Sequence, residues 1–163
     1  KAAHPDKKIL VDLKTMDAGE YEATPFFEAG GDITTVLGAS DMATMKGVIK
    51  AANANNAEAQ IDLIGVEDKT AVAKEAAANG AHIIGVHTGL DAQAAGQTPF
   101  EDLKTIAGLG LNVKVSVAGG INKDTIQSTV RAGADIVVVG AAIYGAPSPA
   151  ESAKELRALV DAA

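Results

Sequence analysis

The stretch RAGADIVVVGAA, residues 131–142, places a glycine after a helix-like segment, then a run of β-branched residues, then a second glycine. The same order of features occurs in EAGGDITTVLGA, residues 28–39, and in ANGAHIIGVHTG, residues 78–89. The first glycines after the helix-like segments stand at positions 30, 80 and 133, so the repeat is about fifty residues long. A repeat of this length holds two βα units.

Short aliphatic or β-branched runs alternate along the whole chain with Ala-rich segments of helical composition. This alternation predicts βαβ units and a parallel sheet. The predicted strands are residues 8–14, 32–38, 59–65, 82–88, 114–120 and 134–140, and the predicted helices are residues 18–29, 42–53, 69–79, 99–107, 123–132 and 149–162.

Residues typical of helix ends flank several of these segments. Pro25 stands inside the first predicted helix, where its missing N–H predicts a kink or a late start. The predicted N-caps are Asp41, Asp68, Asn122 and Ser148, and the predicted glycines just after helix C-termini are Gly30, Gly80 and Gly133.

Two α/β architectures fit six βα units. Three copies of the repeat give six strands, and a fourth copy before residue 1 would give the eight strands of a (βα)8 TIM barrel. The competing architecture is an open, doubly wound sheet that is complete with six strands. The period and a first residue that is not Met favour a single barrel domain over residues 1–163 that lacks its first two βα units.

Composition excludes several classes of protein. A net charge of −7 without a Lys/Arg cluster argues against a nucleic-acid partner. The absence of cysteine excludes disulfides, thiol catalysis and Cys-ligated zinc, and it is compatible with the cytoplasm. The longest apolar run, about residues 136–146, is too short to span a bilayer, and no signal peptide is recognisable.

Polar residues share one face of the predicted strands. Side chains alternate along a strand, so Asp12 and Lys14 lie on the same face, and Asp62 and His87 lie away from the helices near the ends of later strands. In α/β folds, catalytic and ligand-binding residues lie mainly at the carboxyl ends of the strands. A single Asp at the end of a strand is more often a helix cap or an ion-pair partner than a catalytic residue. A single His in such a position is more often a hydrogen-bonded core residue. Together, four groups from three strands indicate a site.

Two glycine-rich strand ends, residues 118–124 and 139–149, each precede a predicted helix. Glycine lets the backbone approach a ligand closely, and helix N-termini bind phosphate, although tight βα turns use glycine in any case. In barrels, the loops after the last two strands are the usual phosphate site. The longest connection, residues 88–103, is either a mobile lid or a surface loop.

The chain resembles the 3-hexulose-6-phosphate synthases, which form part of the orotidine-monophosphate decarboxylase group of (βα)8 barrels. The resemblance runs from the first residue to the last. It rests on VDLKTMDAGEYEA (11–23), ITTVLG (33–38), IDLIGVEDK (61–69), GVHTGLDAQAAGQTPFEDL (85–103), VSVAGGI (115–121) and VVVGAAIYGA (137–146).

The resemblance implies a lyase that adds D-ribulose 5-phosphate, as an enediolate stabilised by Mg²⁺, to formaldehyde in the ribulose monophosphate pathway. It implies that Asp12 is a magnesium ligand, that Lys14 steadies the enediolate, and that Asp17 reaches into the partner subunit's site of a homodimer. It further implies that Asp62 lines the sugar pocket and that His87 carries a proton. The groups implied to bind the substrate phosphate are the backbone N–H groups of Gly119, Gly120, Gly140 and Ala141.

Two alternatives remain at the level of sequence. The related 3-keto-L-gulonate-6-phosphate decarboxylases carry an Arg-bearing segment where this chain has HTGLD (87–91), and GR where it has Gly140 and Ala141. The other alternative is an inactive barrel relative that only binds phosphate.

The resemblance also implies a substrate-contacting acid on the first barrel strand and a magnesium-binding Glu on the second. Neither residue is in this sequence, so we expect an N-terminal part of the protein to precede Lys1.

Overall fold

The structure, a computed structural model, describes all 163 residues. The chain forms two compact units, Lys1–Ile84 and Gly85–Ala163. The first contains β1 (Leu10–Thr15), α1 (Gly19–Glu28), β2 (Ile33–Leu37), α2 (Met42–Ala54), β3 (Glu58–Asp62), α3 (Lys69–Ala78) and the start of β4 (Ile83–His87). The second contains the end of β4, α4 (Leu90–Ala94), α5 (Phe100–Gly108), β5 (Lys114–Ala118), α6 (Ile126–Arg131), β6 (Ile136–Val138), α7 (Ala141–Tyr144) and α8 (Pro149–Asp161).

The strands of the first unit are parallel and follow the order of the sequence. β2 lies between β1 and β3, and β4 begins beside β3, where the His82 N–H donates to the Ala59 carbonyl. In the usual dinucleotide-binding doubly wound order, β1 would instead lie in the middle of the sheet. The sequential order therefore agrees with the barrel arrangement.

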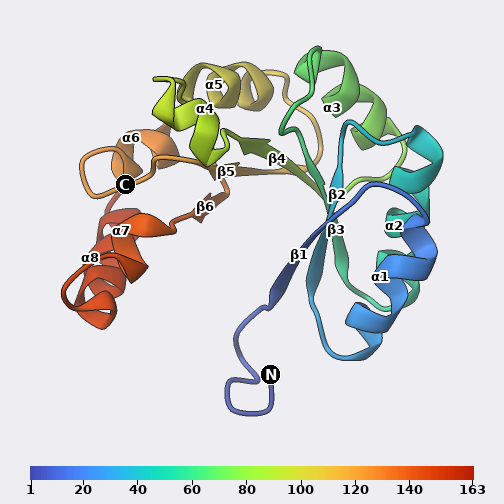
Figure 1. The fold of residues 1–163 in the computed structure, drawn as a ribbon, viewed down its shortest axis with the longest axis horizontal. Coiled ribbons are helices and arrows are strands. Elements are labelled where there is room, and N and C mark those ends of the chain that lie inside the picture. The colour runs from blue at the N-terminus through green and yellow to red at the C-terminus, as the bar shows by residue number, and fades with distance from the viewer. The chain divides into compact units, whose positions relative to one another are not determined.

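The apolar runs that predicted the strands form the core of the first unit. Val36, Ile61, Leu63 and Ile83 are fully buried, as expected for a parallel sheet that is covered by helices. Figure 1 shows α1 and α2 side by side. Gly47 makes this contact possible, because a Cβ at that position would lie 2.8 Å from the backbone nitrogen of Glu20.

The second unit repeats the βα order. β5 and β6 pair in parallel, and the Thr88 N–H, just after β4, donates to the Ala118 carbonyl at the end of β5. Leu103 on α5, Val117 on β5 and Ile126 on α6 are buried. The six predicted strands and their following helices are thus all present, with shifts of about one to three residues at most of their ends.

The structure corrects one of the predicted N-caps, excludes a late start of the first helix and adds two short helices. The first helix does not start late, because α1 begins at Gly19 and contains Pro25 in its interior. The N-cap of α6 is Thr125, because the segment after Asn122 first forms a separate turn in which the Asn122 side chain accepts from the Asp124 N–H. The connection of residues 88–103 contains α4, and the glycine-rich segment after β6 contains α7.

Other helix-end predictions are confirmed. Asp68 is the N-cap of α3, and its carboxylate accepts from the Ala71 N–H at 2.9 Å. Asp41 and Ser148 also occupy N-cap positions, without a side-chain hydrogen bond to the helix. Gly30, Gly80 and Gly133 follow their helices with positive φ, which is the conformation that ends a helix at a glycine.

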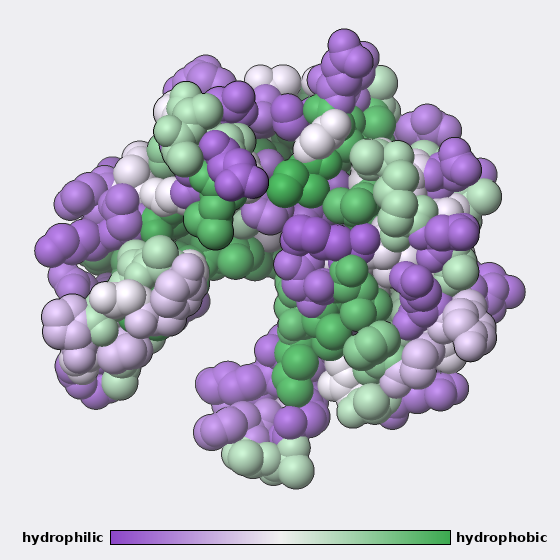
Figure 2. Space-filling view, viewed as in Figure 1, coloured by the Kyte–Doolittle hydropathy of each residue, from purple (hydrophilic) through white to green (hydrophobic).

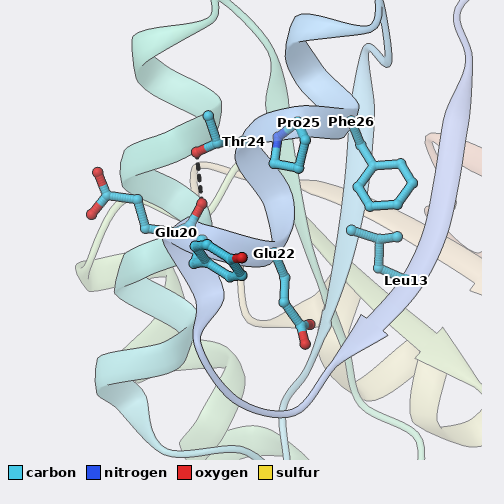
Figure 3. A pocket seen from close by; sticks show the side chains of 7 residues that line it. Leu13, Glu20, Glu22, Thr24, Pro25 and Phe26 are labelled. Atoms are coloured by element: carbon cyan, nitrogen blue, oxygen red, sulfur yellow. Dashed lines mark hydrogen bonds between the residues drawn. The ribbon is translucent and has the colours of Figure 1, made fainter.

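Exposed apolar side chains lie on β1 and on the neighbouring helix α1. Leu10 is 38% and Phe26 is 42% exposed, and Figure 2 shows apolar surface over this strand. A cavity of about 1010 Å³ opens here, between β1 and α1. In Figure 3 the side chains of Leu13 and Phe26 point toward each other on its wall, and Glu20 and Glu22 lie at its rim. No helix of the structure has both the length and the apolar character that crossing a membrane requires.

Candidate active site

The end of β1 departs from regular strand geometry. Val11 of β1 pairs with Thr34 of β2, and Thr15 of β1 pairs with Val36 of β2. Between these two pairs the chain advances by four residues on β1 but by only two on β2. Within this irregularity Lys14 has φ 49°, a left-handed conformation that costs a non-glycine residue about 1–2 kcal/mol. Such strain persists only where surrounding contacts fix it, and it concentrates at functional sites.

Thr35 on β2 supplies those contacts. Its hydroxyl oxygen accepts from the Lys14 N–H at 2.9 Å and donates to Asp12 Oδ1 at 2.7 Å. One side chain, which is 1% exposed, therefore holds both the turned backbone and the carboxylate in front of it. Sequence reasoning missed Thr35, although a threonine in the middle of a buried strand is a recognisable polar signal.

The ammonium group of Lys14 lies between two carboxylates. Lys14 Nζ is 2.6 Å from Asp12 Oδ2 and 3.3 Å from Asp62 Oδ2. Asp62 is almost completely buried, with 3% of its side chain exposed, and its other oxygen accepts from the Ile64 N–H at 2.9 Å. The predicted convergence of these three charged residues is confirmed within the first unit.

The two carboxylates keep Lys14 charged. Burial of the ammonium group lowers the pKa of Lys14, but the hydrogen bond with Asp12 and the negative charges of Asp62 and Asp12 together raise that pKa above its usual value of 10.5. At neutral pH the site therefore presents a permanent positive charge, which is held at a fixed position by two anions.

Asp17 lies outside this cluster. It is exposed in the turn between β1 and α1, where its carboxylate accepts from the Ala18 N–H at 2.7 Å. Ala18 also has a left-handed backbone, with φ 51°. The turn thus places Asp17 on the surface of the first unit.

The second unit brings together the other predicted site residues. His87, Gly119, Gly120, Gly140 and Ala141 all line one cavity of about 250 Å³ at the ends of β4, β5 and β6. Gly119 and Gly120 have φ 112° and 69°, so the chain turns sharply there in a conformation that suits glycine. Consecutive turned peptides of this kind can offer backbone N–H groups to an anion.

Among the other residues that line this cavity, two with polar side chains were not predicted. Gln93 comes from α4, in the connection expected to be a lid or a surface loop, and Tyr144 comes from α7. The Tyr144 ring lies 3.3 Å from the position that a Cβ at Gly140 would occupy. The sequence gives little signal for either residue, because α4 has five residues and α7 has four.

Comparisons of sequence and structure connect this chain with known proteins. The family model described as orotidine 5'-phosphate decarboxylase / HUMPS family matches residues 1–156. A 3-hexulose-6-phosphate synthase from Methylomonas aminofaciens is 63% identical over 159 residues, which are 98% of this chain and 76% of the relative. A crystal structure of 3-hexulose-6-phosphate synthase from Salmonella typhimurium has a TM-score of 0.95 and 37% identity, covering 99% of this chain and 77% of that one.

A solved 3-keto-L-gulonate-6-phosphate decarboxylase from Vibrio cholerae is more distant. Its TM-score is 0.83 at 29% identity, over 99% of this chain and 75% of the neighbour. The likeness to the synthases is therefore greater both in sequence and in structure. The matches favour the barrel and not the doubly wound sheet, in agreement with the strand order of the first unit.

Proposed function

Because the chain belongs to the orotidine 5'-phosphate decarboxylase / HUMPS family, we propose that it carries out the reaction of its 3-hexulose-6-phosphate synthase relatives. In that reaction a lyase joins formaldehyde to D-ribulose 5-phosphate in an aldol addition. The observation that carries the proposal is the position of Lys14 between Asp12 and Asp62.

Lys14 suits the charge that this chemistry creates. Removing a proton beside a carbonyl leaves negative charge on the carbonyl oxygen, and a preorganised cation stabilises such charge as it develops. The ammonium group is fixed by two ion pairs and needs no rearrangement to donate a hydrogen bond to a third anionic oxygen. Asp62, which is buried beside it, would line the wall against which the sugar hydroxyls lie.

Asp12 fits the role of a magnesium ligand. Mg²⁺ prefers carboxylate oxygens and usually binds through one or two of them together with substrate oxygens and waters. The Asp12 carboxylate is half exposed beside Lys14, whereas no group of three or more acidic or His residues in the structure could hold a metal by itself. When bound there, Mg²⁺ would supply a Lewis acid for the substrate oxygens.

The cavity of the second unit suits a phosphate group. Gly119, Gly120, Gly140 and Ala141 would bind the phosphate through their backbone N–H groups, and His87, on the same wall, would carry the proton beside the reacting carbon. A dense anionic group needs such local donors here, because the net charge of the chain is −7.

Two parts of the proposal concern assembly. The exposed position of Asp17 leaves its carboxylate accessible to the partner subunit of a homodimer. The completion of the barrel by two further βα units also stays a prediction. The match covers 76% of the Methylomonas relative, so the relative contains residues that have no counterpart in this chain.

The decisive assay is formaldehyde consumption by the purified protein. It should require both D-ribulose 5-phosphate and Mg²⁺, and the rate per subunit should rise with protein concentration in step with dimer formation. In Lys14→Ala the rate should fall by about 10² to 10³, the usual cost of removing a fixed charge-stabilising group. The matched control is Lys104→Ala on α5, which removes an exposed lysine paired with Glu101 and should leave the rate unchanged.

Other outcomes discriminate the alternatives. Decarboxylation of 3-keto-L-gulonate 6-phosphate without formaldehyde consumption would support the decarboxylase. A wild-type protein that binds inorganic phosphate but turns over neither substrate would support the phosphate-binding relative. Equal rates for Lys14→Ala and Lys104→Ala would show that the charged cluster is not the reacting centre.

A further inference from the structure

Gln93 lies next to the turn that Gly119 and Gly120 form in the second unit. It lies on α4, and its side-chain Nε2 donates to the Thr88 carbonyl at 2.7 Å. The same nitrogen lies 3.2 Å from where a Cβ at Gly119 would stand, and Oε1 lies 3.5 Å from where a Cβ at Gly120 would stand. The amide therefore spans both residues of the turn.

The backbones of Thr88 and Gly119 approach each other closely. A Cβ at Gly119 would lie 2.4 Å from the Thr88 carbonyl oxygen, so only glycine fits there. Thr88 is itself fixed, because its N–H donates to the Ala118 carbonyl and its carbonyl accepts from Gln93. These contacts connect the residue after β4 with the turn after β5 and with the Gln93 side chain of α4.

We propose that Gln93 is a positioning residue that holds the Gly119–Gly120 turn in the conformation that binds the substrate phosphate. It acts through its hydrogen bond to the Thr88 carbonyl, which lies beside Gly119. A neutral amide suits this position for two reasons. It donates to a carbonyl, which a carboxylate cannot do at neutral pH, and it adds no negative charge beside a dianionic group. The inference rests on the proposed function, since it assumes that the phosphate binds at this turn.

The test uses two near-isosteric changes and a matched control. Gln93→Met removes the hydrogen bond without adding charge, and Gln93→Glu removes it and adds an anion. Gln97 is exposed in the same connection and does not line the cavity, so Gln97→Met and Gln97→Glu are the controls. Each variant is measured for KM of ribulose 5-phosphate, for kcat and for the dissociation constant of inorganic phosphate.

We expect Gln93→Met to raise KM and the phosphate dissociation constant about tenfold, the effect of one lost hydrogen bond in a preorganised site, with a smaller change in kcat. Gln93→Glu should weaken phosphate binding further, and salt should reduce the difference between the two variants because it screens charge. Both control variants should match the wild type. A side chain that only stabilises the fold would lower the free energy of unfolding in Gln93→Met and leave KM and the phosphate dissociation constant unchanged.

The inference is overturned if phosphate binding and KM are unchanged in both Gln93 variants, or if Gln93→Met lowers kcat alone. It is also overturned if the wild-type protein does not bind inorganic phosphate. Phosphate binding is measured without turnover, so it separates this inference from the reaction. A protein that consumes no formaldehyde, yet binds phosphate more weakly in Gln93→Met than in Gln97→Met, would refute the proposed function and support the role of Gln93.

Discussion

Thr35 is the residue on which the geometry at the end of β1 depends most directly. Its hydroxyl is the acceptor for the Lys14 N–H and the donor to Asp12, so both groups lose a partner when the hydroxyl is removed. The left-handed backbone of Lys14 would then lose one of the contacts that compensate for its strain.

Thr35→Val should therefore destabilise the protein by about 1–3 kcal/mol, the cost of leaving buried polar groups without partners, and should lower activity. The measurement is urea unfolding, together with the formaldehyde assay. Thr34→Val is the matched control, because the neighbouring Thr34 hydroxyl is buried without a hydrogen-bond partner. Its removal should be neutral or stabilising. Equal losses of stability in the two variants would contradict the role given to Thr35.

At the scale of elements, the contact between α1 and α2 depends on a missing side chain. Gly47→Ala would place a Cβ 2.8 Å from the Glu20 nitrogen and 3.4 Å from Gly19, and all of these neighbours are backbone atoms that cannot rotate away. The two helices would have to separate. We expect a loss of about 1–3 kcal/mol in the free energy of unfolding, as for other overpacked contacts.

Gly108→Ala on α5 is the control for this change, because a Cβ there would meet nothing within 4 Å. Alanine favours the helix over glycine by at most about 1 kcal/mol, so this variant should be as stable as the wild type or more stable. Chemical denaturation of both variants measures the difference. A Gly47→Ala protein as stable as Gly108→Ala would show that α1 and α2 are not in tight contact.

At the scale of the whole molecule, Asp32 and Lys14 are two of the charged groups that shape the pH dependence of stability. The hydrogen bond from the Lys1 ammonium, and then that from the Ile9 N–H, hold the pKa of Asp32 below its usual value of 3.8. A lowered pKa contributes stability that is present above the unfolded value and is lost as pH falls through the folded value. The pKa of Lys14 is raised above 10.5, so its contribution is complete below that unfolded value and is lost as pH rises through the folded value.

Unfolding free energies measured from about pH 2 to 12 should therefore fall at both ends. Asp32→Asn should reduce the slope on the acid side, to which Asp161 also contributes because the hydrogen bond from Arg157 lowers its pKa. Lys14→Met should reduce the slope on the alkaline side, because it removes the ammonium group whose pKa is raised. If either variant keeps the wild-type slope on its own side, the pKa shift assigned to that residue is not the source of the slope.

The sequence predicted the strands well because hydrophobic, β-branched runs between glycines have few other structures open to them. It also predicted which charges meet in the first unit. It did not predict α4 and α7, since helices of five and four residues have too few positions to show a period. The roles of Thr35 and Gln93 depend on contacts with segments 21 and 5 residues away, which alternation along one strand does not describe.

The left-handed backbone at Lys14 also has a consequence for protein design. In a regular strand, an Asp and a Lys two residues apart would project in parallel from one face. Here the chain turns at Lys14, and the lysine side chain returns to Asp12. Copying the segment from Asp12 to Lys14 into another strand would not reproduce the pair. A successful graft would also need a threonine on the adjacent strand and a buried acid on the strand beyond it, in the positions of Thr35 and Asp62.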